Sequence, residues 1–333
     1  MKLLVIRFSS FGDIVQAIAV PRAFLDAYPG STVDWLTRED FANLVAEQPT
    51  VTRVISFSRR SGILGLFSLA WKLSRSNYTH IYDAHSNLRS SILVAVLRVL
   101  SMRSKFAVRP KSRFRRLLFF KFRMRSVLPR PFRAADSYHR PLAKWGLPAT
   151  VPSGPQFRVS AGAIPDLGPA PVVALAPSAA WEMKRWPVEH WKTLMALLPD
   201  VSFVLLGGKE DVFLKELEGP RVKNLAGQLS LVESSRVIAA ADLVISNDTG
   251  SLQVADQMER PTLALIGPTA FGYPSHSTSV ALEKPLWCQP CSKDGRGRCV
   301  NDLYKRCLVE LEPSLVAAQA RALLDRALRN GVE

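Results

Sequence analysis

The chain has 333 residues, of which 47% are hydrophobic, and a formal net charge of +16 at pH 7. This composition is ordinary for a globular protein, and the length suggests two domains. No apolar run approaches the roughly 20 residues that a membrane-spanning helix needs. Arg7 interrupts the apolar N-terminus too early for a secretory signal, so we expect a cytoplasmic protein.

The positive charge is concentrated in the first half of the chain. Residues 1–150 contain 25 Lys and Arg against 8 Asp and Glu, whereas residues 151–333 contain 19 against 20. Segment 98–133 contains 13 Lys and Arg and no acid. Such a stretch attracts nucleic acid, anionic lipid or a phosphorylated substrate, whereas a merely solvated surface usually mixes charges of both signs.

The first half alternates short apolar segments with segments of helical spacing. After the apolar stretch at 2–8, Ile14, Ile18 and Phe24 follow a helical period. Further strands are predicted at 32–37, 53–57, 80–85 and 104–108, and further helices at 39–47, 64–75 and 87–100. Strands that alternate with helices predict an α/β fold with a parallel, doubly wound sheet.

The alternation stops between Gly146 and Pro171, where six prolines and four glycines indicate a linker. It then resumes with strands at 172–177, 201–208, 242–248 and 262–268, helices at 188–198, 210–218, 231–240 and 250–258, and a final helix at 313–328. The predicted domains are therefore 1–150 and 172–333, joined by a linker at 151–171.

Asp13 follows the first predicted strand. The residues before it, Ser9, Ser10 and Gly12, make a small and flexible corner. A carboxylate at this place is most simply a cap or first-turn partner of the helix. At the carboxyl edge of a sheet it is also a candidate general base. The helix N-terminus keeps it ionised and weakly basic, which still suits a sugar hydroxyl that loses its proton late in the reaction.

A second tight corner follows the strand at 242–248. Asp248, Thr249 and Gly250 lead directly into a helix, whose first N–H groups favour an anion, most simply a phosphate.

A loop at the same edge carries Lys184 and Arg185, before the helix that Pro187 opens. A lone loop lysine is usually solvated, but its position at this edge favours a role in anion binding.

Two glycines, Gly207 and Gly208, end the strand at 201–208, and Glu210 or Asp211 opens the next helix. A carboxylate there can accept hydrogen bonds from two ribose hydroxyls. The sequence contains no GxGxxG fingerprint and no P-loop. It also contains no Asp-x-Asp pair, which argues against a metal-clamped nucleotide diphosphate.

All four cysteines lie near the C-terminus, at Cys288, Cys291, Cys299 and Cys307. Four thiols so close together in a cytoplasmic chain predict a structural tetrathiolate zinc site. The alternatives are reduced thiols that pack a loop, or disulfides that form after purification.

With these features together, the chain resembles glycosyltransferase family 9, the family of ADP-heptose:lipopolysaccharide heptosyltransferases. The stretches that carry the resemblance are "RFSSFGD", "KRWPVEHW", "NDTG" with "RPTLALIGPT" after it, and the cluster "CQPC" with a later Cys. Their order and spacing are more specific than any one of them. The resemblance covers nearly the whole chain. It implies GT-B architecture, with two Rossmann-like domains facing across a cleft, and an inverting reaction without a catalytic metal.

The resemblance also implies roles for single residues. Asp13 is then the catalytic base. The donor's diphosphate, sugar and ribose are then bound by Ser178, Lys184, Glu210, Asp248, Thr249, Gly250 and Gln253. Family members usually carry His at the position of Gln253, and Gln can hydrogen-bond but cannot carry a proton. The resemblance therefore leaves the donor sugar open.

The expected acceptor is the anionic inner core of lipopolysaccharide, at the inner face of the cytoplasmic membrane. The residues expected to bind it are Ser10, Gly12, Arg113, Arg115, Arg116 and Lys121. One alternative is a nucleic-acid- or membrane-binding protein that uses segment 98–133, and another is a sugar-nucleotide epimerase of the same architecture. The Phe and Leu residues between the arginines fit a membrane-surface helix at least as well as a nucleic-acid site. An epimerase leaves the basic half unexplained, so we expect a transferase with no nucleic-acid partner.

Overall fold

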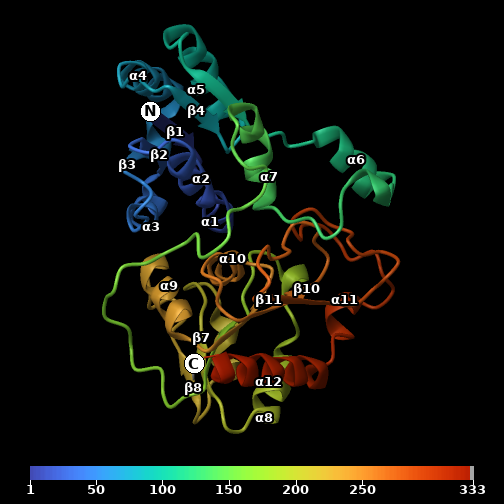
Figure 1. Cartoon of the computed structure of the whole chain (residues 1–333). Helices are drawn as coiled ribbons and strands as arrows, with labels where there is room; N and C mark the ends of the chain where they lie inside the picture. The colour runs from blue at the N-terminus through green and yellow to red at the C-terminus, as the bar shows by residue number, and fades with distance from the viewer. Residues whose placement is uncertain (331–333) are drawn as a thin grey trace. The chain divides into compact units, whose positions relative to one another are not determined.

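The structure is a computed structural model that describes residues 1–330, without the side chains of Arg59 and of residues 328–330. The end of the predicted C-terminal domain, residues 331–333, lies outside the described residues. The chain forms two compact units (Figure 1). Unit 1 contains Met1–Ser112 and Ala135–Val159, and unit 2 contains Arg113–Ala134 and Ser160–Glu333.

Unit 1 is built on a five-stranded parallel sheet in the order β3-β2-β1-β4-β5. The strands are β1 (Lys2–Ile6), β2 (Thr32–Arg38), β3 (Arg53–Phe57), β4 (His80–Asp83) and β5 (Lys105–Val108). The α-helices are α1 (Phe11–Ala17), α2 (Ala19–Ala27), α3 (Ala42–Ala46), α4 (Gly62–Ser74), α5 (Leu88–Leu100) and α7 (Asp136–His139). The alternation predicted for this half is therefore confirmed.

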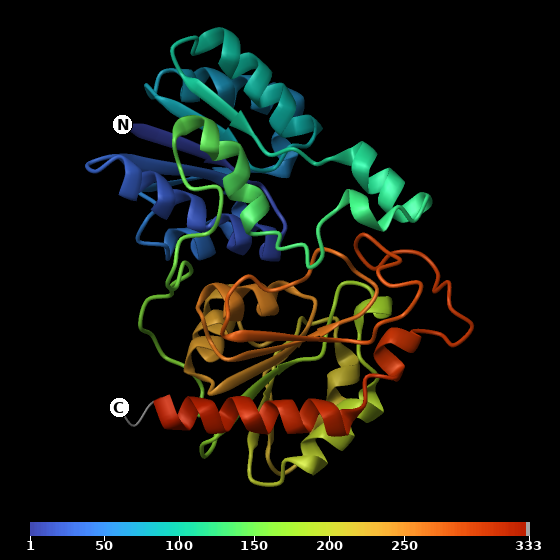
Figure 2. The ribbon, with the colours of Figure 1, turned by 45° about the vertical axis from the view of Figure 1, so that its right-hand side comes forward.

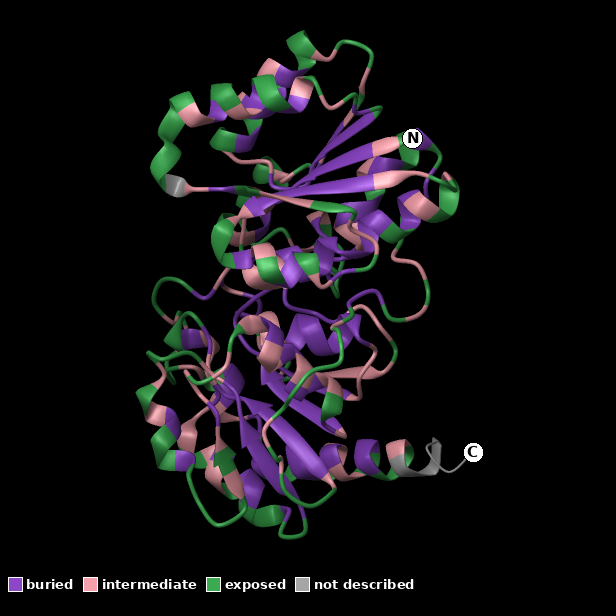
Figure 3. Ribbon diagram, turned by 90° about the vertical axis from the view of Figure 1, so that its left-hand side faces the viewer, coloured by how far each residue is buried: buried purple, intermediate pink, exposed green. Residues whose placement is uncertain are grey.

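Helices cover both faces of this sheet, which explains why its central strand β1 is apolar almost throughout. In β1, residues 3–6 are fully buried. Leu4 and Ile6 pack in one cluster with Leu66 of α4 and Leu93 of α5. Figure 3 shows α4 and α5 together on that face, with α1 and α2 on the opposite one.

Unit 2 is built on a six-stranded parallel sheet in the order β11-β10-β9-β6-β7-β8. The strands are β6 (Val172–Ala176), β7 (Ser202–Leu205), β8 (Val222–Asn224), β9 (Leu243–Asn247), β10 (Thr262–Ile266) and β11 (Ser279–Glu283). The α-helices of residues 160–330 are α8 (Val188–Leu197), α9 (Leu231–Ala240), α10 (Gly250–Gln257), α11 (Arg306–Val309) and α12 (Pro313–Asn330). The edge strands β8 and β11 were not predicted, because neither is buried enough to show a continuous apolar run.

The main core of unit 2 lies between the sheet and the helices α8 and α12. Trp191 of α8 and Leu323 of α12 pack with Val173 and Ile245 of the central strands. Figure 2 shows α12 beside α8 on this side of the sheet, in agreement with the contacts that the two helices share. Among residues 1–330, no helix is long and apolar enough to cross a membrane.

Segment 113–134 differs from the prediction, which grouped it with the first domain. It contains α6 (Arg113–Lys121) and packs with unit 2. The physical reason is a small apolar core that Phe119 and Phe132 form with Ala270. The sequence-based boundary followed the Pro- and Gly-rich linker at 151–171. The few inward-facing apolar side chains of segment 113–134 are hidden between arginines in the sequence.

Each sheet has one switch position, which is the place between two neighbouring strands from which successive strands are added toward opposite edges of the sheet. In unit 1 it lies between β1 and β4, and in unit 2 between β6 and β9. Open α/β sheets bind ligands at the carboxyl ends of the strands that flank such a position. The loops that follow these four strands are therefore where the functional side chains are expected.

Candidate active site

Asp13 lies directly after β1, in the first turn of α1, at the switch position of unit 1. Its Oδ2 atom lies 2.6 Å from the Arg7 guanidinium and accepts a hydrogen bond from the Ser10 hydroxyl at 2.8 Å. Its Oδ1 atom accepts a hydrogen bond from the Tyr138 hydroxyl at 2.9 Å and lies 4.0 Å from Arg109. The side chain is still 36% exposed, so a substrate hydroxyl can approach it.

The surroundings of Asp13 favour its ionised form. Burial alone would raise the pKa of the carboxyl, but the charges of Arg7 and Arg109 and the hydrogen bonds from Ser10 and Tyr138 outweigh it. The pKa of Asp13 therefore lies well below its usual value. The sequence predicts an ionised, weak base because of the helix N-terminus, and the structure adds the charges of Arg7 and Arg109 as causes.

The residues that hold Asp13 were missed in the sequence. Arg7 is 4% exposed and also donates a hydrogen bond to the Ala84 carbonyl at 2.7 Å. The Arg109 guanidinium lies 3.7 Å from the centre of the Tyr138 ring. Both arginines come directly after a strand, Arg7 after β1 and Arg109 after β5, which is a signal that the sequence contained. Nothing in the sequence pointed to Tyr138.

A small pocket of about 50 Å³ lies at the same edge of unit 1. It is lined by Phe8, Ser9, Arg38, Phe57, His85, Asn87 and Arg89. The Nδ1 atom of His85 is buried and has no hydrogen-bond partner among the described residues. Burial and the charges of Arg7 and Lys111 lower the pKa of His85 to about 3, so its imidazole is neutral.

Lys184 and Asp248 form the centre of the candidate site in unit 2. The Lys184 Nζ atom lies 2.9 Å from Oδ2 of Asp248, and the Thr269 hydroxyl donates to the same oxygen at 2.6 Å. The lysine and aspartate side chains are only 14% and 15% exposed. They come from the loops after β6 and β9, which flank the switch position. The structure thus brings the two predicted residues Lys184 and Asp248 together. It also adds Thr269 to the site, which the sequence did not predict.

Two glycines allow the backbone to approach this ion pair. A Cβ atom on Gly272 would lie 2.1 Å from Cγ of Asp248, and one on Gly295 would lie 2.6 Å from Cγ of Lys184. Gly295 also has a φ of +88°, which favours glycine. A side chain at either position would therefore displace the ion pair.

The helix α10 begins at Gly250, immediately after this ion pair. Thr249 is its N-cap, but no side chain forms a capping hydrogen bond to the helix. The Thr249 hydroxyl lies instead 3.0 Å from that of Ser246. The first N–H groups of α10 are consequently available to an anion.

The other donor residues predicted in the sequence occupy different surroundings. Ser178 is half-buried after β6, and Glu210 is exposed in the loop after β7. Asp211 closes the glycine turn instead, because its Oδ2 accepts a hydrogen bond from the Gly208 N–H at 2.7 Å. The α-helix predicted at 210–218 is a short 3₁₀ helix at Val212–Leu217.

Gln253 is only 3% exposed. Its side-chain amide donates a hydrogen bond to the Gly272 carbonyl at 3.3 Å. In this arrangement Gln253 supports the loop against which Asp248 packs.

The basic residues predicted to bind the acceptor lie on α6. Arg113, Arg115 and Lys121 are exposed, and the Arg116 guanidinium lies 4.4 Å from the centre of the Phe271 ring. Because α6 belongs to unit 2, these residues lie in a different unit from Ser10 and Gly12.

The four cysteines are free thiols in and after the loop that follows β11. Burial and the neighbouring thiols raise the pKa of Cys291 to about 11 and that of Cys307 to about 12. In the part of the chain that the structure describes, no group of three or more His, Cys, Asp or Glu residues is arranged to hold a metal ion. The thiols therefore do not form a preassembled zinc site.

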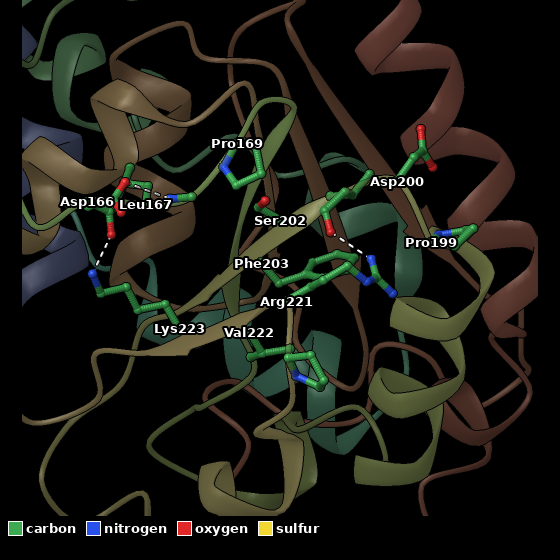
Figure 4. A pocket seen from close by; sticks show the side chains of 13 residues that line it. Asp166, Leu167, Pro169, Pro199, Asp200, Ser202, Phe203, Arg221, Val222 and Lys223 are labelled. Carbon is green, nitrogen blue, oxygen red and sulfur yellow. Dashed lines mark hydrogen bonds between the residues drawn. The ribbon is translucent and has the colours of Figure 1, made fainter.

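A larger pocket of about 420 Å³ lies at the opposite, amino end of the second sheet (Figure 4). The basic side chains that line this pocket donate hydrogen bonds to backbone carbonyls. Arg221 donates to the carbonyls of Leu198 and Val201 at 2.8 and 2.7 Å, and Lys223 donates to that of Asp166 at 2.5 Å. We therefore do not assign this pocket to the active site.

Known proteins resemble this chain along most of its length. Residues 66–297 match the model of glycosyltransferase family 9 (heptosyltransferase). The chain is 25% identical to lipopolysaccharide heptosyltransferase 1 of Pseudomonas aeruginosa, over 97% of this chain and 98% of that protein. It is also 25% identical to lipopolysaccharide heptosyltransferase 2 of Escherichia coli, over 97% of this chain and 99% of that protein.

A solved structure of the E. coli heptosyltransferase WaaC with ADP has a similar fold. The TM-score is 0.69 at 21% sequence identity, over 97% of this chain and 100% of that one. With two parallel α/β sheets in this chain, the likeness confirms the predicted GT-B class of fold.

Proposed function

Because this chain belongs to glycosyltransferase family 9, we propose that it transfers a heptose from an ADP-heptose donor to the inner core of lipopolysaccharide. Two relatives that match almost the whole chain are named lipopolysaccharide heptosyltransferases, and a similar structure contains ADP. The observation in this chain that carries the proposal is Asp13, an ionised and partly exposed carboxylate at the switch position of unit 1.

In the proposed reaction Asp13 is the catalytic base. An acceptor hydroxyl gives its proton to the carboxylate while its oxygen attacks the anomeric carbon of the heptose. The bond from that carbon to the diphosphate breaks, ADP leaves, and the configuration inverts. Arg7 and Arg109 keep Asp13 ionised and weakly basic, so the proton moves late, when the attacking oxygen has become acidic.

The leaving diphosphate is stabilised by unit 2. Lys184 supplies a point charge, and the first N–H groups of α10 supply aligned dipoles. Asp248 holds Lys184 in position, and Thr269 holds Asp248. These groups are arranged before the reaction, so they need little reorganisation as charge develops on the leaving group.

The remaining donor contacts are proposed for loops at the same sheet edge. Glu210, exposed after β7, takes the ribose hydroxyls, and Ser178 lies close to the diphosphate. Gln253 acts indirectly through the Gly272 carbonyl, in place of the direct donor contact expected from the sequence.

We propose that each unit contributes residues to binding of the anionic acceptor. Unit 1 contributes Ser10, Gly12 and the pocket beside His85. Unit 2 contributes the exposed face of α6, with Arg113 and Lys121. Since such an acceptor is attached to lipid, we also propose that the protein works peripherally at the inner face of the cytoplasmic membrane.

Structural zinc at the four cysteines stays a prediction from their spacing. Their sulfur atoms would have to move together to bind it, because the described arrangement does not form the site. Metal analysis of protein that was never oxidised should find about one zinc per chain. Metal-free protein with four titratable thiols would end the prediction.

A thermal-shift panel tests the donor. ADP-heptose and ADP should raise the melting temperature, because a ligand that binds only the folded state stabilises it by mass action. UDP-sugars at the same concentration should give a smaller shift. An equal or larger shift with a UDP-sugar would contradict the proposed donor.

A further inference from the structure

The helix α4 exposes an unusual apolar surface. Ile63, Leu64, Phe67 and Trp71 are 61%, 84%, 48% and 52% exposed. Because 63, 67 and 71 are spaced by four residues, they lie along one side of the helix, with Leu64 beside them. The inward side is apolar as well and packs in the core of unit 1. A helix that only covers a core has a polar outer face, so the outer residues of α4 need another explanation.

The helix α5, which packs against α4, also exposes apolar side chains. Leu88 and Val99 of α5 are 77% and 72% exposed, and Met102 just after it is 86% exposed. A pocket of about 440 Å³ joins the C-terminal ends of the two helices, where Leu100 and Met102 contribute to its lining. Single exposed apolar residues are normal, whereas a contiguous set marks a surface for a partner or a membrane.

The positive charge around α4 and α5 indicates what kind of partner would bind this surface. Between residues 59 and 103 the sequence contains seven basic residues, Arg59, Arg60, Lys72, Arg75, Arg89, Arg98 and Arg103. The one acid in that range, Asp83, is 1% exposed. A second copy of the chain would bring the same positive charge and be repelled. A nucleic acid would leave the apolar residues in water.

We propose that α4, together with the exposed residues at the two ends of α5, docks unit 1 on an anionic lipid bilayer. In this mode α4 lies along the membrane surface with Leu64, Phe67 and Trp71 in the acyl boundary. Lys72 and Arg75 contact lipid phosphates. Apolar insertion and electrostatic attraction then add to one another, as in other interfacial amphipathic helices.

This surface deepens the peripheral membrane association proposed above, and it differs from the one expected in the sequence. That expectation rested on segment 98–133, whose helix α6 belongs to unit 2. On α6 the exposed Phe114 and Leu117 alternate with arginines, which suits binding of an anionic oligosaccharide. On α4 the exposed apolar residues are contiguous, which suits insertion into lipid.

Vesicle sedimentation of the full chain tests the proposal. The probes are phosphatidylcholine vesicles with and without phosphatidylglycerol. The parent should sediment with the anionic vesicles and much less with the neutral ones. The double variant Leu64→Asn/Phe67→Asn should lower the partition coefficient by roughly tenfold or more, because both side chains lose their favourable transfer into lipid. The matched control is Leu197→Asn/Val212→Asn, which changes two side chains of unit 2 that are 46% and 64% exposed.

A second measurement reports on α4 directly. Lipids with brominated acyl chains should quench part of the parent's tryptophan fluorescence, and Trp71→Phe should remove that part. Transfer to a soluble, delipidated core oligosaccharide should be the same in the parent and the α4 variant, since α4 has no role in the chemistry.

The outcomes separate this proposal from the proposed function. The docking surface is overturned if the α4 variant sediments like the parent, if Trp71 is not quenched, or if the parent binds neither kind of vesicle. A parent that binds through α4 but transfers no sugar to the soluble acceptor would leave the docking surface in place and reject the proposed activity. An α4 variant that changes only the oligomeric state would assign the surface to contacts between copies, and would also overturn the proposal.

Discussion

Asp13 is held by two guanidinium groups, and this arrangement determines the chemistry it can perform. A carboxylate with a depressed pKa cannot remove a proton from an unactivated hydroxyl early in a reaction. It can accept the proton once bond formation has made that hydroxyl acidic. In the proposed reaction, Arg7, Arg109 and Tyr138 position and tune Asp13, because all three contact its carboxylate.

Replacing the carboxylate should separate catalysis from donor binding. Asp13→Asn should lower the transfer rate by roughly 10²–10⁴-fold, because the amide cannot accept the proton. Donor affinity, measured by calorimetry with ADP, should stay near the parent value. Asp26→Asn is the matched control, since Asp26 forms an exposed ion pair with Arg22 on the next helix. Near-normal turnover in Asp13→Asn would make Asp13 a helix-capping residue only.

The pH dependence of transfer should report the lowered pKa of Asp13. Because the folded pKa lies below its ordinary value, the carboxylate stays ionised to low pH, and kcat/KM should show no acidic fall assignable to Asp13 above about pH 4. The stability that this group contributes is present above about pH 4 and is lost as the pH falls further.

Arg7→Gln should move the acidic fall of kcat/KM to higher pH, whereas Arg7→Lys should move it less because the charge is kept. A profile that is identical in the parent and Arg7→Gln would show that Arg7 does not tune the base.

Lys184 should contribute both to the binding of ADP and to the rate of sugar transfer. Lys184→Ala removes a positive charge from the leaving diphosphate, so it should weaken ADP binding and slow transfer together. Lys192→Ala is the matched control, because Lys192 pairs with Glu189 on the exposed side of α8. If Lys184→Ala binds ADP and transfers sugar like the Lys192 control, the ion pair with Asp248 is purely structural.

The apolar periodicity of the sequence predicts most strands and helices correctly. The strands from β1 to β7 and the helices α4, α5, α9 and α10 appear where the sequence placed them, because their apolar residues form a short run or follow a helical period. The edge strands β8 and β11 of unit 2 were missed, since neither contains a buried residue and each is defined by hydrogen bonds to one neighbouring strand. The assignment of α6 to unit 2 was also missed, because it depends on a few contacts with residues far along the chain.

The exposed basic face of α6 should govern binding of the acceptor and leave binding of the donor unchanged. Neutralising Arg113, Arg115, Arg116 and Lys121 together to Gln should raise the apparent KM for the acceptor. It should also flatten the dependence of that KM on salt, because exposed charges are screened over about 8 Å at physiological ionic strength. Titrations of the parent and the quadruple variant with ADP measure whether donor binding is unchanged. Loss of ADP binding with an unchanged acceptor KM would reverse the roles given to α6 and the Lys184 loop.

At the scale of the whole molecule, the sequence predicted two α/β domains and the family, but could not show how single residues meet. The Lys184 and Asp248 ion pair joins residues 64 positions apart, and Arg109 reaches Asp13 from 96 positions away. Such contacts depend on strand order, which local patterns do not specify. In the proposed reaction, the site of unit 1 and that of unit 2 must act on the two substrates together, and much of the rate then comes from their alignment.

The central claim is a transfer from ADP-heptose to an anionic core acceptor. The most direct measurement incubates the protein with ADP-heptose and a heptose-free lipopolysaccharide core, and follows the acceptor by mass spectrometry and the new linkage by NMR. We expect one added heptose per acceptor, with release of ADP, inverted anomeric configuration, and no product with Asp13→Asn. Consumption or epimerisation of the ADP-heptose while the acceptor stays unmodified would contradict it.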